Sequence, residues 1–208
     1  MFPMIRLFSS RLTPLFLKLG LSANQLTMAS LTFGIFACIA FISESKSSNL
    51  LGALLFFICY ILDNCDGEVA RAQAKTSAFG DKLDTFVDWV VHGCFFSAIG
   101  YQSFNRTEDP IWVYLGLISA IGCTINYLIV TFYVGSSSKM RIVSENKTQR
   151  KENDFLKNII FVFREMFRHD FCFIVLILAL FDLIWLLLPV AVIGTHVYWI
   201  MLLIKLRV

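Results

Sequence analysis

Four aspartates stand close together in the first half of the chain, and side chains of this kind can hold metal ions. Asp63 and Asp66 are three positions apart, and Asp84 and Asp88 are four positions apart. On a helix either spacing places both members of a pair on one face, so two facing helices would bring four carboxylates together. Ionised carboxylates in a confined pocket repel one another, and divalent cations relieve that repulsion. Oxygen ligands favour magnesium or manganese over zinc, and paired ions of this class clamp phosphates in phosphoryl chemistry.

A glycine and an arginine accompany the aspartates at spacings that suit phosphate binding. Gly67 lies on the same helix face as Asp63 and would let a phosphate approach the backbone. Arg71 lies one further turn along, where its guanidinium can bind a phosphate oxygen. In the competing interpretation, aspartates at helix ends are only caps or interfacial charges. We adopt a similar interpretation for Glu68 and Asp81, which we expect to be solvated loop charges.

The spacing of these residues resembles the complete signature of the CDP-alcohol phosphotransferases. The signature runs from Asp63 through Arg71 and Gly80 to Asp88, and every specified position is present. The stretch Ser-Ala-Asn-Gln-Leu-Thr at 22–27 also resembles the family's Pro-Asn-x-x-Thr entry to its first span, with alanine in place of proline. The resemblance extends to the order of apolar segments over nearly the whole chain.

The resemblance implies a role for each signature residue. Two divalent ions, Mg²⁺ or Mn²⁺, would be held by Asp63, Asp66 and Asp84, with Asp88 close enough to contribute. Asp88 would also be the general base that takes the proton from the acceptor hydroxyl. The hydroxyl would attack the phosphorus distal to the cytidine, and CMP would leave. The nucleotide-binding residues that the resemblance implies are Asn24, Thr27, Asp63, Gly67, Arg71 and Gly80.

A basic stretch after the fourth apolar segment is a candidate acceptor site. Residues 136–141 resemble the Ser-x-x-Lys-x-Arg segment that contacts a phosphorylated acceptor in phosphatidylinositol-phosphate and phosphatidylglycerol-phosphate synthases. Arginine binds phosphate through two parallel hydrogen bonds, so arginines further along suit the same role. The alternative is ordinary cytoplasmic charge attracted to anionic lipid headgroups. The acceptor-binding candidates are Ser136, Lys139, Arg141, Arg164 and Arg168.

The elements that must position these residues are predicted to be membrane helices. Of the 208 residues 57% are hydrophobic and 16% are charged, whereas about 25% are charged in a soluble domain. A helix needs ~20 residues to cross the hydrocarbon core, so the length fits one all-α polytopic membrane domain over 1–208. We predict an N-terminal amphipathic surface helix over 1–21 and a second surface helix over 155–169. The six predicted transmembrane helices cover about 24–42, 49–70, 85–104, 111–134, 171–188 and 190–204.

The distribution of basic residues predicts the orientation of the spans. All but Lys46 and Arg106 of the 18 Lys and Arg residues fall on one side of a six-span bundle. By the positive-inside rule that side, with both termini and the aspartates, faces the cytoplasm. Pro189 is predicted to separate the last two spans into a tight hairpin on the outer side. We expect Asp182, in the fifth span, to pair within the bundle or to line a cavity.

Three functional classes follow from these observations. The first is a phospholipid-biosynthesis transferase with a CDP-linked donor, CDP-diacylglycerol being favoured, and an alcohol acceptor such as inositol phosphate or glycerol phosphate. The second is the same chemistry with a CDP-linked small alcohol, acting on diacylglycerol or a soluble acceptor. The third is a small ion- or proton-coupled transporter, whose carboxylates would be spread through the membrane depth. Nucleic-acid binding is disfavoured because no basic soluble surface is predicted, and the family resemblance implies a homodimer among membrane lipids.

Overall fold

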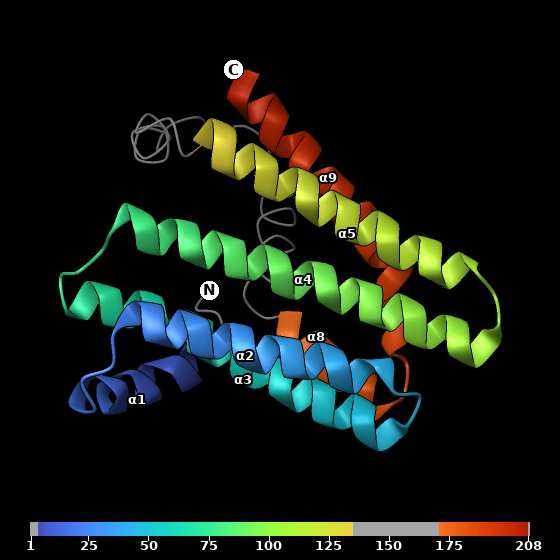
Figure 1. The fold of residues 1–208 in the computed structure, drawn as a ribbon, viewed down its shortest axis with the longest axis horizontal. Coiled ribbons are helices and arrows are strands. Elements are labelled where there is room, and N and C mark those ends of the chain that lie inside the picture. The colour runs from blue at the N-terminus through green and yellow to red at the C-terminus, as the bar shows by residue number, and fades with distance from the viewer. Residues whose placement is uncertain (1–3, 135–170, 208) are drawn as a thin grey trace, which may run out of the picture.

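The computed structural model describes residues 4–134 and 171–207, and every regular element within these ranges is a helix (Figure 1). In chain order the elements are α1 (Ile5–Lys18), α2 (Ala23–Ile42), α3 (Lys46–Ala72), α4 (Ala78–Thr107), α5 (Ile111–Ile129), the π-helical turn η1 (Val130–Val134), α8 (Phe171–Leu180), the 3₁₀ turn η2 (Ile184–Leu186) and α9 (Leu187–Arg207). The all-α prediction is therefore confirmed for this part of the chain. Outside the described residues lie the predicted surface helix over 155–169 and the acceptor candidates Ser136, Lys139, Arg141, Arg164 and Arg168.

Four described helical stretches are long and apolar enough to cross a hydrocarbon core ~30 Å thick. They cover Ala23–Ile42, Lys46–Ala72, Ile111–Phe132 and Ile184–Leu203. Helix α4 has 30 residues but carries several charged residues in its first turns, and α8 has ten residues. Neither is among the four. The apolar helices identify a membrane protein.

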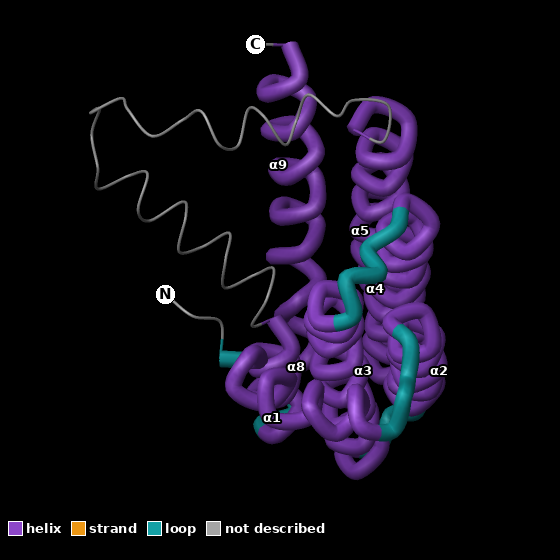
Figure 2. The backbone as a smooth tube through the Cα atoms, turned by 90° about the vertical axis from the view of Figure 1, so that its left-hand side faces the viewer, coloured by secondary structure: helices purple, strands orange, loops and turns teal. Residues whose placement is uncertain are grey.

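Helix α2 packs against both α3 and α4, and the three helices form the centre of the bundle. Helices α3 and α4 contact each other through side chains, among them Phe56 and Phe95. Helices α1 and α8 lie against α3, whereas α5 packs along α4 and α9 packs along α5 (Figure 2). The fully buried rings of Phe56 and Phe95 stack with centroids 4.4 Å apart, and Phe41 meets Phe95 edge-on at 5.3 Å. Such aromatic pairs add about 0.5–1.5 kcal/mol beyond the burial of their area. This aromatic core holds together the three helices whose ends carry the candidate metal- and nucleotide-binding residues.

Two glycines allow α5 to lie close to α4. A Cβ atom on Gly100 would be 2.8 Å from the carbonyl oxygen of Trp112, and one on Gly116 would be 2.7 Å from that of Phe96. Both obstacles are backbone atoms, which cannot rotate aside as a side chain can. Small residues therefore set the distance between these helices, as is common within membranes.

The predicted boundary between the fifth and sixth spans is wrong. Helix α8 ends at Leu180, and the chain turns through Asp182, whose φ of 57° is left-handed. The amide of Leu183 donates to the carbonyl of Leu178 and that of Asp182 donates to the carbonyl of Ala179, the pattern of a Schellman stop. Pro189 instead lies in the first turn of α9, where a missing N–H costs nothing.

Candidate active site

Three of the four predicted aspartates converge where the end of α3 meets the start of α4. Each of Asp63, Asp66 and Asp84 offers a carboxylate oxygen, and these oxygens all lie within 4.8 Å of one another. Asp66 is buried, with 6% of its surface exposed, and the other two are half-buried. We call these three residues the carboxylate cluster. It concentrates negative charge in a partly dehydrated position, where like charges disfavour simultaneous ionisation.

The turn between α3 and α4 positions this cluster. The amide of Lys75 donates to the carbonyl of Ala70 and the amide of Ala74 donates to that of Arg71, which ends α3 in a Schellman motif. Ala74 has a φ of 51°, a left-handed conformation that costs an L-residue about 1–2 kcal/mol. Ser77 then caps α4 by accepting a hydrogen bond from the amide of Gly80 at 3.0 Å. The two helices are thereby joined at their aspartate-bearing ends (Figure 1).

The hydroxyl of Thr27 on α2 contacts the carboxylate cluster. It donates to Oδ2 of Asp66 at 2.5 Å, and both side chains are buried. The start of α2 is fixed by a capping box in which Ser22 and Gln25 exchange hydrogen bonds. Thr27, implied to be a nucleotide-binding residue, thus orients one of the candidate metal ligands.

The remaining nucleotide-binding candidates gather at the same end of the bundle. A Cβ atom on Gly67 would lie 3.2 Å from Nη1 of Arg71, so the guanidinium rests directly over this glycine. A Cβ atom on Gly80 would lie 3.4 Å from Oδ1 of Asn24, which places α2 beside the first turn of α4. The side-chain amide of Gln73 donates to the carbonyl of Leu21 at 3.0 Å and ties α3 to the segment before α2.

Asp88 lies one turn beyond Asp84 on α4 and is exposed, outside the tight group of three. Its carbonyl oxygen is 2.8 Å from Nδ1 of His92, whose Nε2 is 2.8 Å from the hydroxyl of Tyr60 on α3. The neighbouring Trp89 donates from its indole to the hydroxyl of Thr124 on α5 at 3.0 Å. These contacts fix the rotation of α4 about its axis at the level of Asp88.

The carboxylate cluster fits a hard divalent cation. Mg²⁺ and Ca²⁺ bind oxygen ligands at about 2.0–2.6 Å, so ligand atoms on one ion lie up to about 5 Å apart, as they do here. All three contributing groups are carboxylates, the chemistry that favours magnesium or manganese. One ion is accommodated by these three side chains, and a second would require further oxygen ligands nearby.

Glu68 is a functional candidate that the sequence interpretation missed, and the expectation of a solvated loop charge is wrong. It lies within α3, and its side chain is 15% exposed. Its two carboxylate oxygens accept hydrogen bonds from Ser9 at 2.8 Å and Thr13 at 2.6 Å on α1, and Nε of Arg6 lies 3.8 Å away. The signal available in the sequence was the spacing of Ser9 and Thr13, which places both hydroxyls on one face of α1. Asp81 is exposed, as expected, but within the first turn of α4 rather than a loop.

A cavity of about 200 Å³ opens one turn from Asp88, between α4, α5, α8 and α9. Its lining is mostly apolar, with His92, Asn126 and Thr195 among the polar members. Oδ1 of Asn126 is buried without a hydrogen-bond partner among the described residues. Sequence reasoning missed the cavity because its lining residues come from four separate segments.

The sequence was compared with those of known protein families and proteins. The sequence model of the CDP-alcohol phosphatidyltransferases matches residues 21–206. A bifunctional IPC transferase and DIPP synthase of Thermococcus kodakarensis is 32% identical over 117 residues, which are 56% of this chain and 25% of that protein. A CDP-diacylglycerol–glycerol-3-phosphate 3-phosphatidyltransferase of Rickettsia bellii is 35% identical over 71 residues, 34% of this chain and 39% of that protein. The chain thus spans well under half of the length of these relatives.

A solved structure has the same fold. The phosphatidylinositol phosphate synthase of Mycobacterium tuberculosis, crystallised with CDP-DAG bound, superposes with a TM-score of 0.56 at 22% identity. The superposition covers 91% of this chain and 90% of that one. Because the family model matches nearly the whole sequence, this chain belongs to the CDP-alcohol phosphatidyltransferase family.

Proposed function

We propose that this protein transfers a phosphatidyl-type group from a CDP-linked donor to an alcohol acceptor and releases CMP. The favoured donor is CDP-diacylglycerol, and the favoured acceptors are inositol phosphate and glycerol phosphate. The observation that carries the proposal is the convergence of the carboxylate cluster with Gly67 and Arg71, in a chain that matches the family over residues 21–206. The bound CDP-DAG of the mycobacterial structure and the name of the rickettsial relative support this donor.

In the proposed mechanism each residue acts on the donor or the acceptor. Mg²⁺ or Mn²⁺ held by the carboxylate cluster, and a second ion that Asp88 helps to bind, would neutralise the charge of the pyrophosphate. Arg71 would bind a phosphate oxygen. Asp88 takes the proton of the acceptor hydroxyl while the hydroxyl oxygen attacks the phosphorus distal to the cytidine. The bond from that phosphorus to the bridging oxygen breaks, and CMP leaves.

The geometry around the glycines suits a nucleotide. Gly67 and Gly80 present backbone without side chains at the ends of α3 and α4. Asn24, next to Gly80, offers an amide that can donate to or accept from a base or ribose. We propose that Asn24, Thr27, Asp63, Gly67, Arg71 and Gly80 together hold the CDP moiety, whereas Ser136, Lys139, Arg141, Arg164 and Arg168 remain the proposed acceptor ligands.

The membrane arrangement is part of the proposal. We propose one domain over 1–208 with six spans, a homodimeric assembly, and both termini and the site facing the cytoplasm, as the positive-inside rule indicates. Helix α1 would lie at the membrane surface, because Leu7 and Leu15 are at least half exposed on it. Lipid substrates would then reach the carboxylate cluster from the side of the bundle.

The first experiment is CMP release by the purified protein with Mg²⁺ and CDP-diacylglycerol. Inositol phosphate, glycerol phosphate, inositol and serine are offered in parallel, beside an Asp88→Asn variant. Turnover with one acceptor that is lost in the variant supports the proposal and identifies the alcohol. Turnover only with a CDP-linked small alcohol and diacylglycerol would reverse the donor assignment, and no turnover with either donor would favour the transporter class.

The apolar cavity next to Asp88 is proposed to hold part of an acyl chain. Gly194 lines it, and a Cβ atom there would meet nothing within 4 Å, so Gly194→Leu has room for its Cβ at the cavity wall. Gly93 is the matched control, because it has equal room but does not line the cavity. We expect Gly194→Leu to lower kcat/KM for CDP-diacylglycerol about tenfold, a loss typical of misfit in an apolar pocket. Equal effects of Gly93→Leu and Gly194→Leu would exclude this use of the cavity.

A further inference from the structure

We infer that Glu68 is a positioning residue that holds the signature segment, residues 63–71 of α3, by binding the N-terminal helix α1. The inference rests on the proposed function, because it assigns a role in organising that site. Both oxygens of the Glu68 carboxylate are engaged, one by Ser9 and the other by Thr13. Hydrogen bonds to a charged acceptor are roughly twice as strong as those between neutral groups.

The position of Glu68 within α3 gives this contact its significance. Asp66 and Glu68 are two residues apart, which is about 200° around a helix, so they face nearly opposite directions. Asp66 accepts from Thr27 on α2, and Glu68 accepts from α1. One turn of α3 is therefore held by hydroxyl groups from two sides, and Gly67 lies between the two held residues.

The contact between Glu68 and α1 is buried, and it pairs hydroxyl donors with a carboxylate acceptor. Ser9 is fully buried and Thr13 is 8% exposed, and both face Glu68 from the same side of α1 as the fully buried Ile5. The more exposed Arg6 lies at the edge of this contact, with its Nε 3.8 Å from Glu68. Cys65, also fully buried, lies with its Sγ 3.6 Å from the carbonyl oxygen of Ser9. If α1 left this position, the Glu68 carboxylate would lose two partners and the Cys65 thiol would become accessible.

A double-mutant cycle tests whether Glu68 acts through α1. The variants are Glu68→Ala, Ser9→Ala with Thr13→Val, and all three substitutions together, assayed for CMP release across a Mg²⁺ titration. We expect the apparent Mg²⁺ affinity to fall about tenfold in each of the first two variants, the scale seen when groups that orient metal ligands are removed. The apparent Mg²⁺ affinity of the triple variant should be no lower than that of the first two variants, because all three substitutions break the same contact. Additive losses would overturn the inference.

Cysteine modification gives a readout that does not depend on catalysis. The unaltered protein and the variants are treated with N-ethylmaleimide, and modification of Cys65 is quantified on its peptide by mass spectrometry. A cysteine-free peptide of the same digest serves as the internal reference for the amount of protein. We expect Cys65 to react at least about fivefold faster in Glu68→Ala than in the unaltered protein. Glu68→Gln keeps one acceptor oxygen, so its Cys65 should react at a rate between these two.

The two measurements separate the possible failures. The control is Asp81→Ala, which removes an exposed acid of α4 and should change neither Cys65 labelling nor Mg²⁺ dependence. Loss of activity in Glu68→Ala with unchanged Cys65 labelling would show that Glu68 does not hold α1, and would overturn the inference. Failure of the proposed function would differ, because the unaltered protein would release no CMP while Cys65 protection still depended on Glu68.

Discussion

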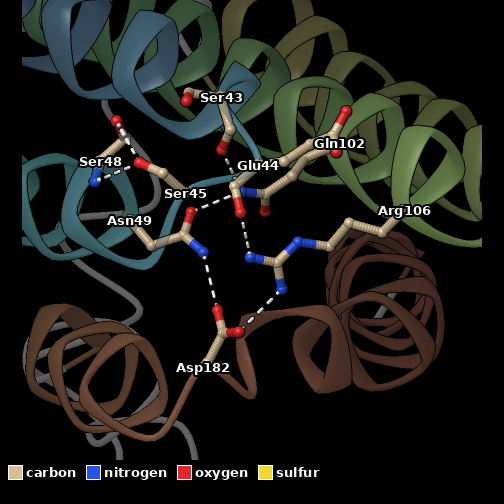
Figure 3. A network of polar contacts seen from close by, with 8 residues as sticks. All are labelled: Ser43, Glu44, Ser45, Ser48, Asn49, Gln102, Arg106 and Asp182. Carbon is tan, nitrogen blue, oxygen red and sulfur yellow. Dashed lines mark hydrogen bonds and ion pairs between the residues drawn. The ribbon is translucent and has the colours of Figure 1, made fainter.

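Polar groups occur at both ends of the α3–α4 pair. The two ends differ in whether their charged side chains have the same sign or opposite signs. At one end Asp63, Asp66 and Asp84 collect three acids within 4.8 Å. At the other end a network joins Asn49 of α3, Gln102 and Arg106 of α4, and Asp182 between α8 and η2 (Figure 3). We call this second group the distal network. It contains a single carboxylate and a single guanidinium.

The groups of the distal network satisfy one another. Nη1 of Arg106 lies 3.0 Å from Oδ2 of Asp182, and the Asn49 amide donates to Oδ1 of the same residue at 3.1 Å. Arg106 also donates to the carbonyl oxygen of Glu44, and the Gln102 amide donates to Oδ1 of Asn49. Partly buried charges that are fully paired hold a structure together without needing a ligand.

The two ends differ in whether a bound cation would stabilise them. The distal network pairs opposite charges, so its charged groups have partners within the fold. The carboxylate cluster places like charges together, which is unfavourable until a cation joins them. Local unfavourable arrangements that the rest of the fold maintains are characteristic of functional sites. Substitutions at the two ends should therefore separate activity from stability.

The largest effect is expected for Asp66→Asn in the carboxylate cluster. The amide keeps the shape of the side chain and can still accept from Thr27, but it removes one anionic ligand. CMP release should fall about a thousandfold. Without metal the melting temperature should not fall, because one repulsive charge is gone. Activity assays and thermal scans in detergent, with and without Mg²⁺, measure both quantities.

The control for this prediction is Asp81→Asn, which removes an exposed acid of the same helix as Asp84. Its activity should stay within about twofold of the unaltered protein, as for most surface substitutions. A clear drop in the metal-free melting temperature of Asp66→Asn would contradict the comparison, since it would mean that the cluster stabilises the fold as it stands.

A smaller effect is expected when the orientation of Asp66 is disturbed. Thr27→Val keeps the branched shape but removes the hydroxyl that donates to Asp66. The apparent Mg²⁺ affinity should fall about tenfold, with little change in kcat when both the metal and the CDP-linked donor are saturating. Thr27→Ser keeps the hydroxyl and should retain most of the affinity. A Thr27→Ser variant as weak as Thr27→Val would show that packing, rather than the hydrogen bond, is what matters. Both are measured by Mg²⁺ titration of CMP release.

The convergence of Asp63, Asp66 and Asp84 was predictable because helix periodicity and an antiparallel turn suffice to bring such spacings together. The contacts of Glu68 were not predictable, because they depend on which helix packs behind α3. The helical periodicity of α3 does not identify that neighbouring helix. The expected pairing of Asp182 within the bundle is confirmed by its contacts with Asn49 and Arg106, but these partners could not be predicted, for the same reason. The members of the distal network are far apart in sequence and meet only through tertiary packing.

The boundary at the last hairpin shows a further limit of sequence reasoning. The sequence pattern predicts a helix stop at Pro189, but proline is tolerated in a first helical turn. The actual stop is Asp182, whose left-handed conformation is more typical of glycine or asparagine. Its ion pair with Arg106 and its hydrogen bond from Asn49 hold it there, and neither contact can be read from an apolar segment with one acid.

The smallest effect on activity is expected at the distal network, where Asp182→Asn tests the structural half of the comparison. Asparagine tolerates the left-handed backbone of this position, so the substitution removes the charge without disturbing the turn. Arg106 then loses its anionic partner, and because both side chains are partly exposed the loss should be about 1 kcal/mol of stability. The melting temperature in detergent should fall by a few degrees, while CMP release per folded molecule and its Mg²⁺ dependence stay within about twofold. An activity loss without a change in melting temperature would mean that the two ends of α3 and α4 are coupled in function, and that the distal network is more than a structural tie.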